Sequence, residues 1–335
     1  GDERKTKIVA AEGEFDIEDL IKEENTVVAL THFGYIKRMP IDTYKSQRRG
    51  GKGITGISTR EDDFVKQIFT ASTHDTILFF SNKGKLYKLR GYEIPEAGRT
   101  AKGTAIVNLL RLDNGEKISA VIPIQNFDNG KYLLMCTQNG IIKKTSINEY
   151  NSNKKTGLLA ITLKEDDELI NVRLTDGADN IVMVTKKGMC ITFDEKDVRP
   201  VGRSAQGVIG IRLDEDDKVV GMESILNNKS ATLLAITENG FGKRTELEEY
   251  RVQNRGGKGV ITYKVTPKTG VIVGIRIAVG EEDVMLITDT GTIIRLKVND
   301  ISVLGRATQG VTLMRTNDGS KVVSIEIIEP EENEE

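Results

Sequence analysis

One short run of residues recurs along this chain, and its plainest copy reads Ile181-Val182-Met183-Val184-Thr185-Lys186-Lys187-Gly188. An apolar, β-branched run followed by a polar pair and a glycine is typical of a strand that enters a tight hairpin turn. Six such runs end in Thr or Ser, and each is followed by a turn glycine, at Gly34, Gly84, Gly140, Gly188, Gly240 and Gly291. These glycines are 50, 56, 48, 52 and 51 residues apart, so the chain is a six-fold repeat.

A second column of glycines keeps step with the first. It follows by 19 residues in five copies and by 17 in the third, at Gly53, Gly103, Gly157, Gly207, Gly259 and Gly310. In the fourth copy we expect strands over 181–185, 189–193, 208–213 and 218–225. Four strands in about 50 residues are typical of a propeller blade. The sequence predicts an all-β, six-bladed, propeller-like disc over residues 25–328, with blades at about 25–75, 76–130, 131–178, 179–230, 231–282 and 283–328.

The ends of the chain and its cysteines indicate its setting. We expect residues 1–24 to form a junction with one short helix over 16–24, and residues 329–335 to form an acidic tail. Gly1 is no initiator residue, so we expect a piece of a longer protein. No run approaches the ~20 apolar residues of a membrane span. Cys136 and Cys190 lie inside apolar runs, which favours buried thiols in a reducing cytoplasm over a disulfide or metal ligands.

No residue pattern predicts a catalytic or metal site. His32 and His74 fall at unrelated points of the repeat, without partners at ligand spacing. The acidic run 214–217 lacks the alternating ligands of a calcium loop and is expected to be a solvated turn. Residues 51–56 match G-x-G-x-x-G but lead into a strand, so the context of a dinucleotide site is missing. We expect no catalytic residue, metal or cofactor in this chain.

The net charge of −2 first argues against nucleic acid as a ligand, because such proteins are usually basic. The charge is uneven, however. Residues 1–24 carry net −5 and residues 326–335 net −6, which leaves +9 for residues 25–325. We expect the acidic turns 165–168, 214–217 and 281–283 to lie at the ends of the blades opposite the basic loops.

Basic residues recur at two places in the repeat: the strand after the turn glycine, and the loop before the second glycine, where odd and even copies differ. In a ring of blades, such positions form a band around one axis, and a band of cations suits a bent polyanion such as DNA. The candidate DNA-binding residues are Lys37, Arg38, Lys88, Arg90, Lys143, Lys144, Lys243, Arg244 and Arg295 in the strands, and Gln47, Arg48, Arg49, Gly50, Gly51, Lys52, Gly53, Arg99, Lys102, Lys154, Lys155, Arg203, Arg255, Lys258 and Arg306 in the loops.

The pattern predicts DNA binding without sequence preference, because it contains no recognition helix and no aromatic platform for bases. Two alternatives stay open. A propeller can serve as a platform for protein partners, with its rim charges acting only in solubility. A propeller can also hold an active site on its axis, which the lack of a catalytic constellation disfavours.

The first-blade loop, Gln47-Arg48-Arg49-Gly50-Gly51-Lys52-Gly53, resembles the seven-residue box that marks the A subunits of bacterial DNA gyrase. The six repeats resemble the C-terminal domain of those proteins over essentially the whole chain. This resemblance implies a β-pinwheel, in which neighbouring blades exchange strands, and a role in wrapping double-stranded DNA around the rim with positive handedness. It also implies a bacterial, nucleoid-associated A2B2 holoenzyme that contains the remainder of the gyrase A polypeptide and the gyrase B polypeptide. That holoenzyme would use ATP and Mg²⁺ to introduce negative supercoils. The cleavage tyrosine and the ATPase of that enzyme would lie outside this chain, so the resemblance implies a non-catalytic domain.

Three details of the resemblance bear on function, and the last two of them stay open. In the related topoisomerase IV protein the box is degenerate or missing, so the intact box favours gyrase over a topoisomerase IV-like protein. A second box at 253–259 departs from the pattern only at Asn254, and whether it contacts DNA stays open. The acidic tail resembles tails that modulate wrapping in some family members, and it is equally typical of a disordered solubilising end.

Overall fold

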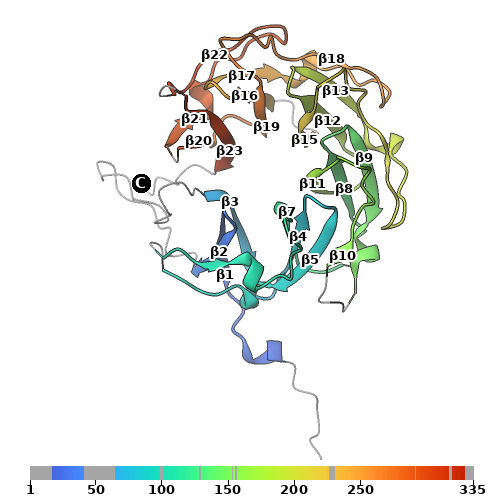
Figure 1. Cartoon of the computed structure of the whole chain (residues 1–335), viewed down its shortest axis with the longest axis vertical. Coiled ribbons are helices and arrows are strands. Elements are labelled where there is room, and N and C mark those ends of the chain that lie inside the picture. The colour runs from blue at the N-terminus through green and yellow to red at the C-terminus, as the bar shows by residue number, and fades with distance from the viewer. Residues whose placement is uncertain are drawn as a thin grey trace, which may run out of the picture.

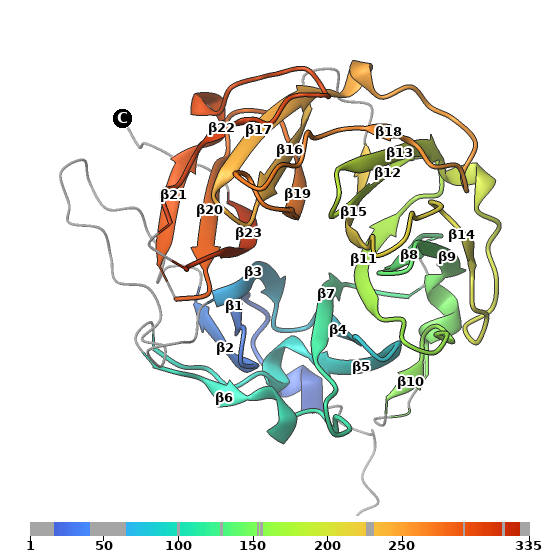
Figure 2. The ribbon, with the colours of Figure 1, turned by 45° about the horizontal axis from the view of Figure 1, so that its top comes forward.

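The structure is a computed structural model that describes residues 17–40, 65–98, 101–127, 130–152, 154, 157–225, 231–290, 292–316 and 319–328. Six small antiparallel sheets stand around one central axis and form a disc (Figures 1 and 2). The described part consists of strands and short 3₁₀ turns, and no helix in it has the length and apolar character to cross a membrane. The predicted all-β, six-bladed architecture is confirmed.

Each blade is built on a hairpin whose first strand is the recurring apolar run. The run is buried from end to end in most copies, as expected for a strand covered on both faces. The hairpins are β1 (Asn25–Thr31) with β2 (Tyr35–Pro40), β4 (Thr76–Ser81) with β5 (Lys85–Arg90), β8 (Tyr132–Thr137) with β9 (Ile141–Ser146), β12 (Asn180–Thr185) with β13 (Met189–Asp194), β16 (Thr232–Thr237) with β17 (Phe241–Glu246), and β20 (Asp283–Thr288) with β21 (Ile293–Lys297).

One strand per blade pairs with the other side of the apolar run and lies closest to the axis (Figure 1). These innermost strands are β3 (Val65–Ser72), β7 (Ile118–Ile124), β11 (Leu169–Thr175), β15 (Val219–Ile225), β19 (Ile272–Ala278) and β23 (Val322–Ile328). The pairing of each contains a register shift near the end of the apolar run. Such bulges increase the local twist of a strand, which suits the crowded centre of a disc.

The outermost strand of a sheet comes from the next repeat. These strands are two residues long, and they are β6 (Thr104–Ala105), β10 (Leu158–Leu159), β14 (Val208–Ile209), β18 (Val260–Ile261) and β22 (Val311–Thr312). β14 pairs with β9, for example, and β18 pairs with β13, each one blade back along the chain. The strand exchange that the resemblance implies is therefore confirmed in five sheets. The third strand predicted over 208–213 is shorter than expected, because only Val208–Ile209 pairs as a strand.

Both glycine columns serve this exchange. The carbonyl of each described turn glycine accepts an N–H from the incoming segment at 2.7–2.9 Å, as when Thr262 donates to Gly188. Gly188 has φ +88, and a Cβ there would lie 2.3 Å from the Tyr263 carbonyl oxygen. Gly259, in the second column, has φ +78, and a Cβ there would lie 2.1 Å from the Cys190 carbonyl oxygen. Only glycine combines this conformation with so close an approach of two backbones.

The Thr or Ser that ends each apolar run also has a structural cause. Its buried hydroxyl oxygen accepts the N–H of the residue four positions on, at 3.0–3.3 Å in all six hairpins. In the fourth blade, Met189 donates in this way to Thr185 Oγ1 at 3.1 Å. The side chain therefore satisfies a buried donor at the tight turn, where the ladder supplies no carbonyl.

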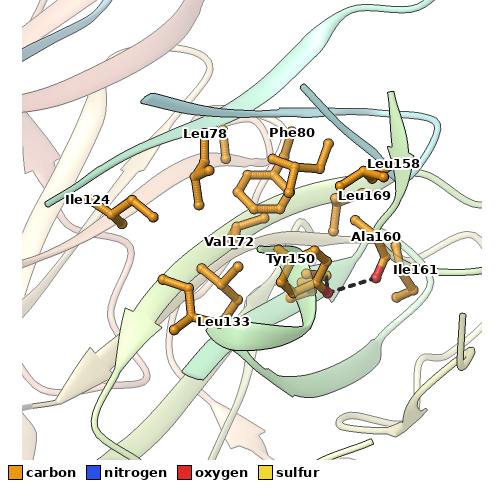
Figure 3. Close-up of a cluster of buried hydrophobic side chains, with 14 residues drawn as sticks. Leu78, Phe80, Ile124, Leu133, Tyr150, Leu158, Ala160, Ile161, Leu169 and Val172 are labelled. Atoms are coloured by element: carbon orange, nitrogen blue, oxygen red, sulfur yellow. Dashed lines mark hydrogen bonds between the residues drawn. The ribbon is translucent and has the colours of Figure 1, made fainter. Parts of the chain in front are cut away.

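The apolar cores lie between neighbouring blades. Figure 3 shows the one between the second and third, where Leu78 and Phe80 pack against Leu133 and Val172. Tyr150 belongs to the same cluster, and its hydroxyl donates to the Ala160 carbonyl at 3.1 Å. Tyr150 lies in η5 (Ile147–Tyr150), one of the 3₁₀ turns that follow the second hairpin strand. The others of this kind are η3 (Gly91–Glu93), η6 (Glu195–Asp197), η7 (Leu247–Glu249) and η8 (Val298–Asp300), while η4 (Ile106–Asn108) follows β6.

The predicted helix over 16–24 is wrong in its described part. Residues Ile17–Leu20 form a single 3₁₀ turn, η1, and residues 21–24 are not helical. This segment is held to the disc by tertiary contacts instead, since Thr73 Oγ1 donates to the Lys22 carbonyl at 2.9 Å. Residues 1–16 and 329–335, which include most of the predicted junction and the acidic tail, lie outside the described residues.

Candidate nucleic-acid interface

Three predicted DNA-binding lysines lie inside the disc. Lys37, Lys143 and Lys243 occupy the third place of the second hairpin strand in odd blades, and they are 1%, 0% and 1% exposed. Their ammonium groups donate to backbone carbonyls of the next blade's loop. Lys37 Nζ lies 2.9 Å from Gly98 O and 2.8 Å from Ala101 O.

The fourth place of the same strand is basic in most blades and also faces the protein. Its side chain reaches the 3₁₀ turn of the next blade, as when Arg38 Nε donates to Ile94 O at 2.9 Å. Lys88 Nζ donates to Tyr150 O at 3.1 Å, and Lys144 Nζ donates to Glu195 O at 3.0 Å. Arg244 Nε donates to Ile301 O at 2.9 Å. Three of these four carbonyls lie at the C-terminal ends of short 3₁₀ turns, where the backbone supplies no donor. The Glu195 carbonyl begins its turn and also accepts the Val198 N–H at 2.9 Å.

The last two strand cations form ion pairs. The guanidinium of Arg90 contacts the Glu18 carboxylate of η1, with Nε 3.1 Å from Oε2. Arg295 Nε lies 2.6 Å from Asp283 Oδ2 on the neighbouring strand. We assign a structural role to all nine strand cations and leave them out of the DNA-contacting set that we propose below. Repeat four, which lacks a cation there, carries buried Thr192 instead.

The buried lysines give the domain an expected pH dependence. Burial lowers the pKa of Lys143 and of Lys243 to about 8, whereas an unfolded lysine keeps a pKa of about 10.4. The two buried lysines therefore make the folded chain bind fewer protons than the unfolded chain between about pH 8 and pH 10, and their contribution to the free energy of unfolding rises with pH. The buried thiols of Cys136 and Cys190 have raised pKa values and act in the opposite direction above the ~8.5 of an unfolded cysteine, as do the buried tyrosines near pH 10. The lysine contribution is therefore measured by urea unfolding across about pH 7–10 as a difference in slope between the parent chain and lysine variants.

A matched set of variants tests the assignment. Lys143→Met and Lys243→Met should each lower the slope of the free energy of unfolding against pH relative to the parent, whatever their effect on stability at pH 7. Lys186→Met, at an exposed lysine of the β12–β13 turn, should leave the slope unchanged. A wild-type slope in both buried-site variants would contradict the assignment.

The cations of the loops that lead into the exchanged strands lie at the outer edge of the disc, since the exchanged strand is the far edge of each sheet. Lys154 and Lys258 are exposed, and Lys102, Arg203 and Arg306 are half-buried. Lys102 Nζ lies 3.7 Å from the centre of the Tyr35 ring, and Arg306 Nε lies 3.8 Å from Glu249 Oε2. The box at 47–53, Arg99 and Lys155 lie outside the described residues.

The second box uses its cations partly within the protein. Arg255 donates to Asp197 O from Nε at 2.9 Å and to Ile209 O from a terminal nitrogen at 3.0 Å. Lys258 Nζ lies 2.6 Å from Asp214 Oδ1, and this contact lowers the pKa of the Asp214 carboxyl. The expectation that acidic turns lie away from the basic loops is therefore wrong for this pair, because the exchanged strand carries the loop back over the preceding blade's turn.

Two cations that sequence reasoning missed lie beside this loop. Lys196 and Arg199 are exposed and line an open groove of about 570 Å³ with Asp197, Val201, Val208 and Arg255. The place of Lys196 carries no cation in the other repeats, and the place of Arg199 carries one in only two of them, as Lys45 and Arg251, so a search for cations in nearly every repeat could not find them. The groove brings a further basic patch to the rim at the fourth and fifth blades.

The described residues contain no cluster of three His, Cys, Asp or Glu side chains placed to hold a metal ion. Cys136 and Cys190 are buried and unpaired with one another, and burial raises the pKa of the Cys190 thiol to about 12. A thiol with so high a pKa carries little thiolate near neutral pH and is a poor nucleophile. Both cysteines act as small core residues.

Comparison with known proteins agrees with the six-fold repeat. The family profile described as "DNA gyrase C-terminal domain, beta-propeller" matches residues 25–72, 75–125, 131–176, 179–225, 231–278 and 282–329. The DNA gyrase A subunit of Clostridium acetobutylicum is 56% identical over 335 residues, which are 100% of this chain and 40% of that protein. Its counterpart from Staphylococcus epidermidis is 48% identical over 335 residues, 99% of this chain and 38% of that protein. The chain thus spans about two fifths of the curated relatives it matches.

Solved structures show the same fold. The C-terminal domain of DNA topoisomerase IV superposes with a TM-score of 0.78 at 28% identity, covering 92% of this chain and 94% of that one. A DNA gyrase A C-terminal domain superposes with a TM-score of 0.75 at 28% identity, covering 91% and 99%. The two TM-scores are too similar to favour either gyrase or topoisomerase IV, but the family profile and the curated relatives favour gyrase. The chain belongs to the family of β-propeller C-terminal domains of the DNA gyrase A protein.

Proposed function

We propose that this domain binds double-stranded DNA without sequence preference and bends it around its rim. The observation that carries the proposal is the row of loop cations at the outer edges of successive blades. Lys102, Lys154, Arg203, Lys258 and Arg306 come from five consecutive repeats, each next to an exchanged strand. Cations repeated at steps around a disc suit a phosphate backbone that follows the same curve.

The distribution of charge supports the same conclusion. Residues 25–325 carry net +9 although the chain as a whole carries −2. In the second box the Gly256 N–H donates to Gly210 O at 2.6 Å, so the phosphate contacts that we propose come from cationic side chains rather than from a backbone nest. Contacts of this kind position a duplex but read no bases.

The family membership supports a finer proposal. We infer that the DNA wraps with positive handedness and that a neighbouring segment is thereby presented for strand passage by a holoenzyme of gyrase A and gyrase B proteins. In that holoenzyme ATP would drive negative supercoiling, while this domain would bind DNA without itself cutting it. The intact box at 47–53 favours this role over that of a topoisomerase IV-like protein.

A salt series tests the binding. Each phosphate contact contributes about 0.9 to the slope of log affinity against log salt, so six contacts predict a slope of about −5. Lys196→Ala combined with Arg199→Ala should lower the magnitude of the slope by about 2 if the groove meets two phosphates. Lys186→Ala, which removes one exposed charge from a hairpin turn, serves as the control. Absent or salt-insensitive binding would favour the protein-platform alternative.

A topology assay tests the wrapping. Nicked plasmid is ligated in the presence of the 335-residue chain, and the linking number of the closed product is compared with that of plasmid closed alone. Positive wrapping predicts a positive shift that grows with the amount of protein bound. An unchanged linking number at saturating binding would reject wrapping while leaving DNA binding intact.

A further inference from the structure

The rim loops of this domain come in two kinds, and a buried residue of the preceding blade alternates with them. Even blades carry Gly-Arg-x-x-x-Gly at 98–103, 202–207 and 305–310. The third place of the preceding second strand holds Lys37, Lys143 and Lys243 before these three loops. Before the odd loops of the third and fifth blades it holds Tyr87 and Ile191.

The three lysines hold equivalent points of the even loops. Lys243 Nζ lies 2.7 Å from Gly305 O, 2.6 Å from Arg306 O and 3.0 Å from Thr308 Oγ1. Lys143 Nζ donates to Arg203 O and, at 2.6 Å, to Ala160 O. Lys37 binds the first and fourth carbonyls of its loop, as described above. All three ammonium groups thus tie down the same turn from beneath.

The odd loops pack on the same place without an ammonium group. A Cβ at Gly157 would lie 2.7 Å from the Tyr87 ring, and a Cβ at Gly257 would lie 3.6 Å from Ile191 Cδ1. Glycine backbone therefore rests on an apolar side chain in odd blades. In even blades the loop carbonyls turn inward, and an ammonium group with three donors satisfies them. The kind of loop therefore alternates together with the chemistry of the buried residue beneath it.

The lysine contacts fix the base of a rim arginine. Among the carbonyl oxygens that Lys143 and Lys243 bind are those of Arg203 and Arg306, so the anchor sits on the backbone of the residue that carries the loop guanidinium. The Arg306 guanidinium has only long contacts of its own, 3.8 Å from Glu249 Oε2 and 3.4 Å from Ile261 O, and ordering such a side chain on binding costs affinity. An anchored backbone removes part of that cost before DNA arrives.

We propose that Lys143 and Lys243 are positioning residues for DNA binding: each sets the place at which the arginine whose carbonyl it holds meets the phosphate backbone, without touching DNA itself. This rests on the DNA-binding function proposed above. It also explains why lysine phases with the rim loops although its side chain is buried.

Lys243→Met in the 335-residue chain tests the proposal. The variant should fold, as judged by far-UV circular dichroism and a cooperative melt, and its salt slope should fall by about 0.9, the loss of one phosphate contact. The linking-number shift should fall with it. Thr308→Val removes the hydroxyl that accepts from Lys243 and donates to Gly305 O, and it should reproduce these changes. This second variant keeps the test open if Lys243→Met does not fold.

A double-mutant cycle separates positioning from general damage. Arg306→Ala should lower the salt slope by a similar amount, and adding Lys243→Met or Thr308→Val to it should lower the slope no further. Lys258→Ala lies in the neighbouring odd loop and should add fully to Lys243→Met. Additive losses for Lys243 or Thr308 with Arg306, or a parental slope in both folded single variants, would overturn the proposal. A parent chain that binds no DNA would instead overturn the proposed function.

Discussion

The chain with Arg276→Met is expected to have a free energy of unfolding about 2–3 kcal/mol below that of the parent, because the substitution breaks a row of ion pairs around the central axis. The row runs over the innermost strands of four blades. Arg173 pairs with Glu223 at 3.0 Å from Nε, and Arg276 lies 3.6 Å from Glu223 and 3.1 Å from Glu326. Burial opposes the charge of Arg276, but the two carboxylates outweigh it and raise the pKa of its guanidinium.

The expected loss is below the ~3–5 kcal/mol of a fully buried broken pair for two reasons. Glu223 keeps Arg173 as a partner, and the Glu326 side chain is 24% exposed, so water solvates part of its charge. Urea unfolding followed by circular dichroism measures the change, with an unchanged m-value as the check that the unfolded state is comparable. A loss under about 0.5 kcal/mol, the usual size of a surface effect, would show that the row contributes nothing to stability.

The other two blades supply a matched control. The strand register places Phe69 and Ile122 at the position that Arg173, Glu223, Arg276 and Glu326 occupy in the remaining blades. The fold therefore accepts apolar residues there. Replacing both ends of a buried pair by apolar groups is often neutral, so Arg276→Met with Glu326→Leu should recover most of the loss. No recovery in the double variant would assign the effect of Arg276 to packing rather than to charge.

The repeat and its hairpins were predictable from the sequence, because the features that encode them are local. The turn glycines and the Thr or Ser before them act within a few residues of their own position. The second glycine column was visible as a pattern, but its cause is contact with a strand about 70 residues earlier, as between Gly259 and Cys190. Periodicity located these glycines, and only the structure shows what they approach.

The positions of the cations were the part that sequence could not resolve. A lysine in a polar stretch is normally a surface residue, and nothing local marks Lys143 as buried. The exchanged strand and its loop cover the edge on which Lys143 lies, and that cover comes from the next repeat. The recurrence of cations thus pointed both to strand cations that stabilise the fold and to loop cations that form a candidate binding surface. It missed Lys196, whose place is basic in one blade alone, and Arg199, whose place is basic in only three of the six repeats.

Substitution of Arg48, Arg49 and Lys52 by alanine is expected to abolish supercoiling by the assembled holoenzyme while leaving relaxation. The second box indicates why the first should matter more. Its Arg255 and Lys258, which correspond in sequence to Arg49 and Lys52, are engaged by carbonyls and by Asp214. Its exposed Asn254 stands where the first box carries Arg48, so the first box has one more cation to offer a phosphate.

Supercoiling requires a wrapped segment of defined hand, whereas relaxation requires strand passage alone, so losing the box should separate the two activities. Plasmid assays with and without ATP measure both, and a thermal melt of the 335-residue chain checks that the triple variant still folds. Arg255→Ala with Lys258→Ala is the matched control and should keep most of the supercoiling activity, because those cations are partly engaged within the protein and offer fewer contacts to a phosphate. Loss of both activities in the triple variant would indicate damage to the domain, and retention of both would refute the role of the box. If the control also abolishes supercoiling, both boxes are needed for wrapping. The difference between Arg48 and Asn254 would then not explain a greater role of the first box.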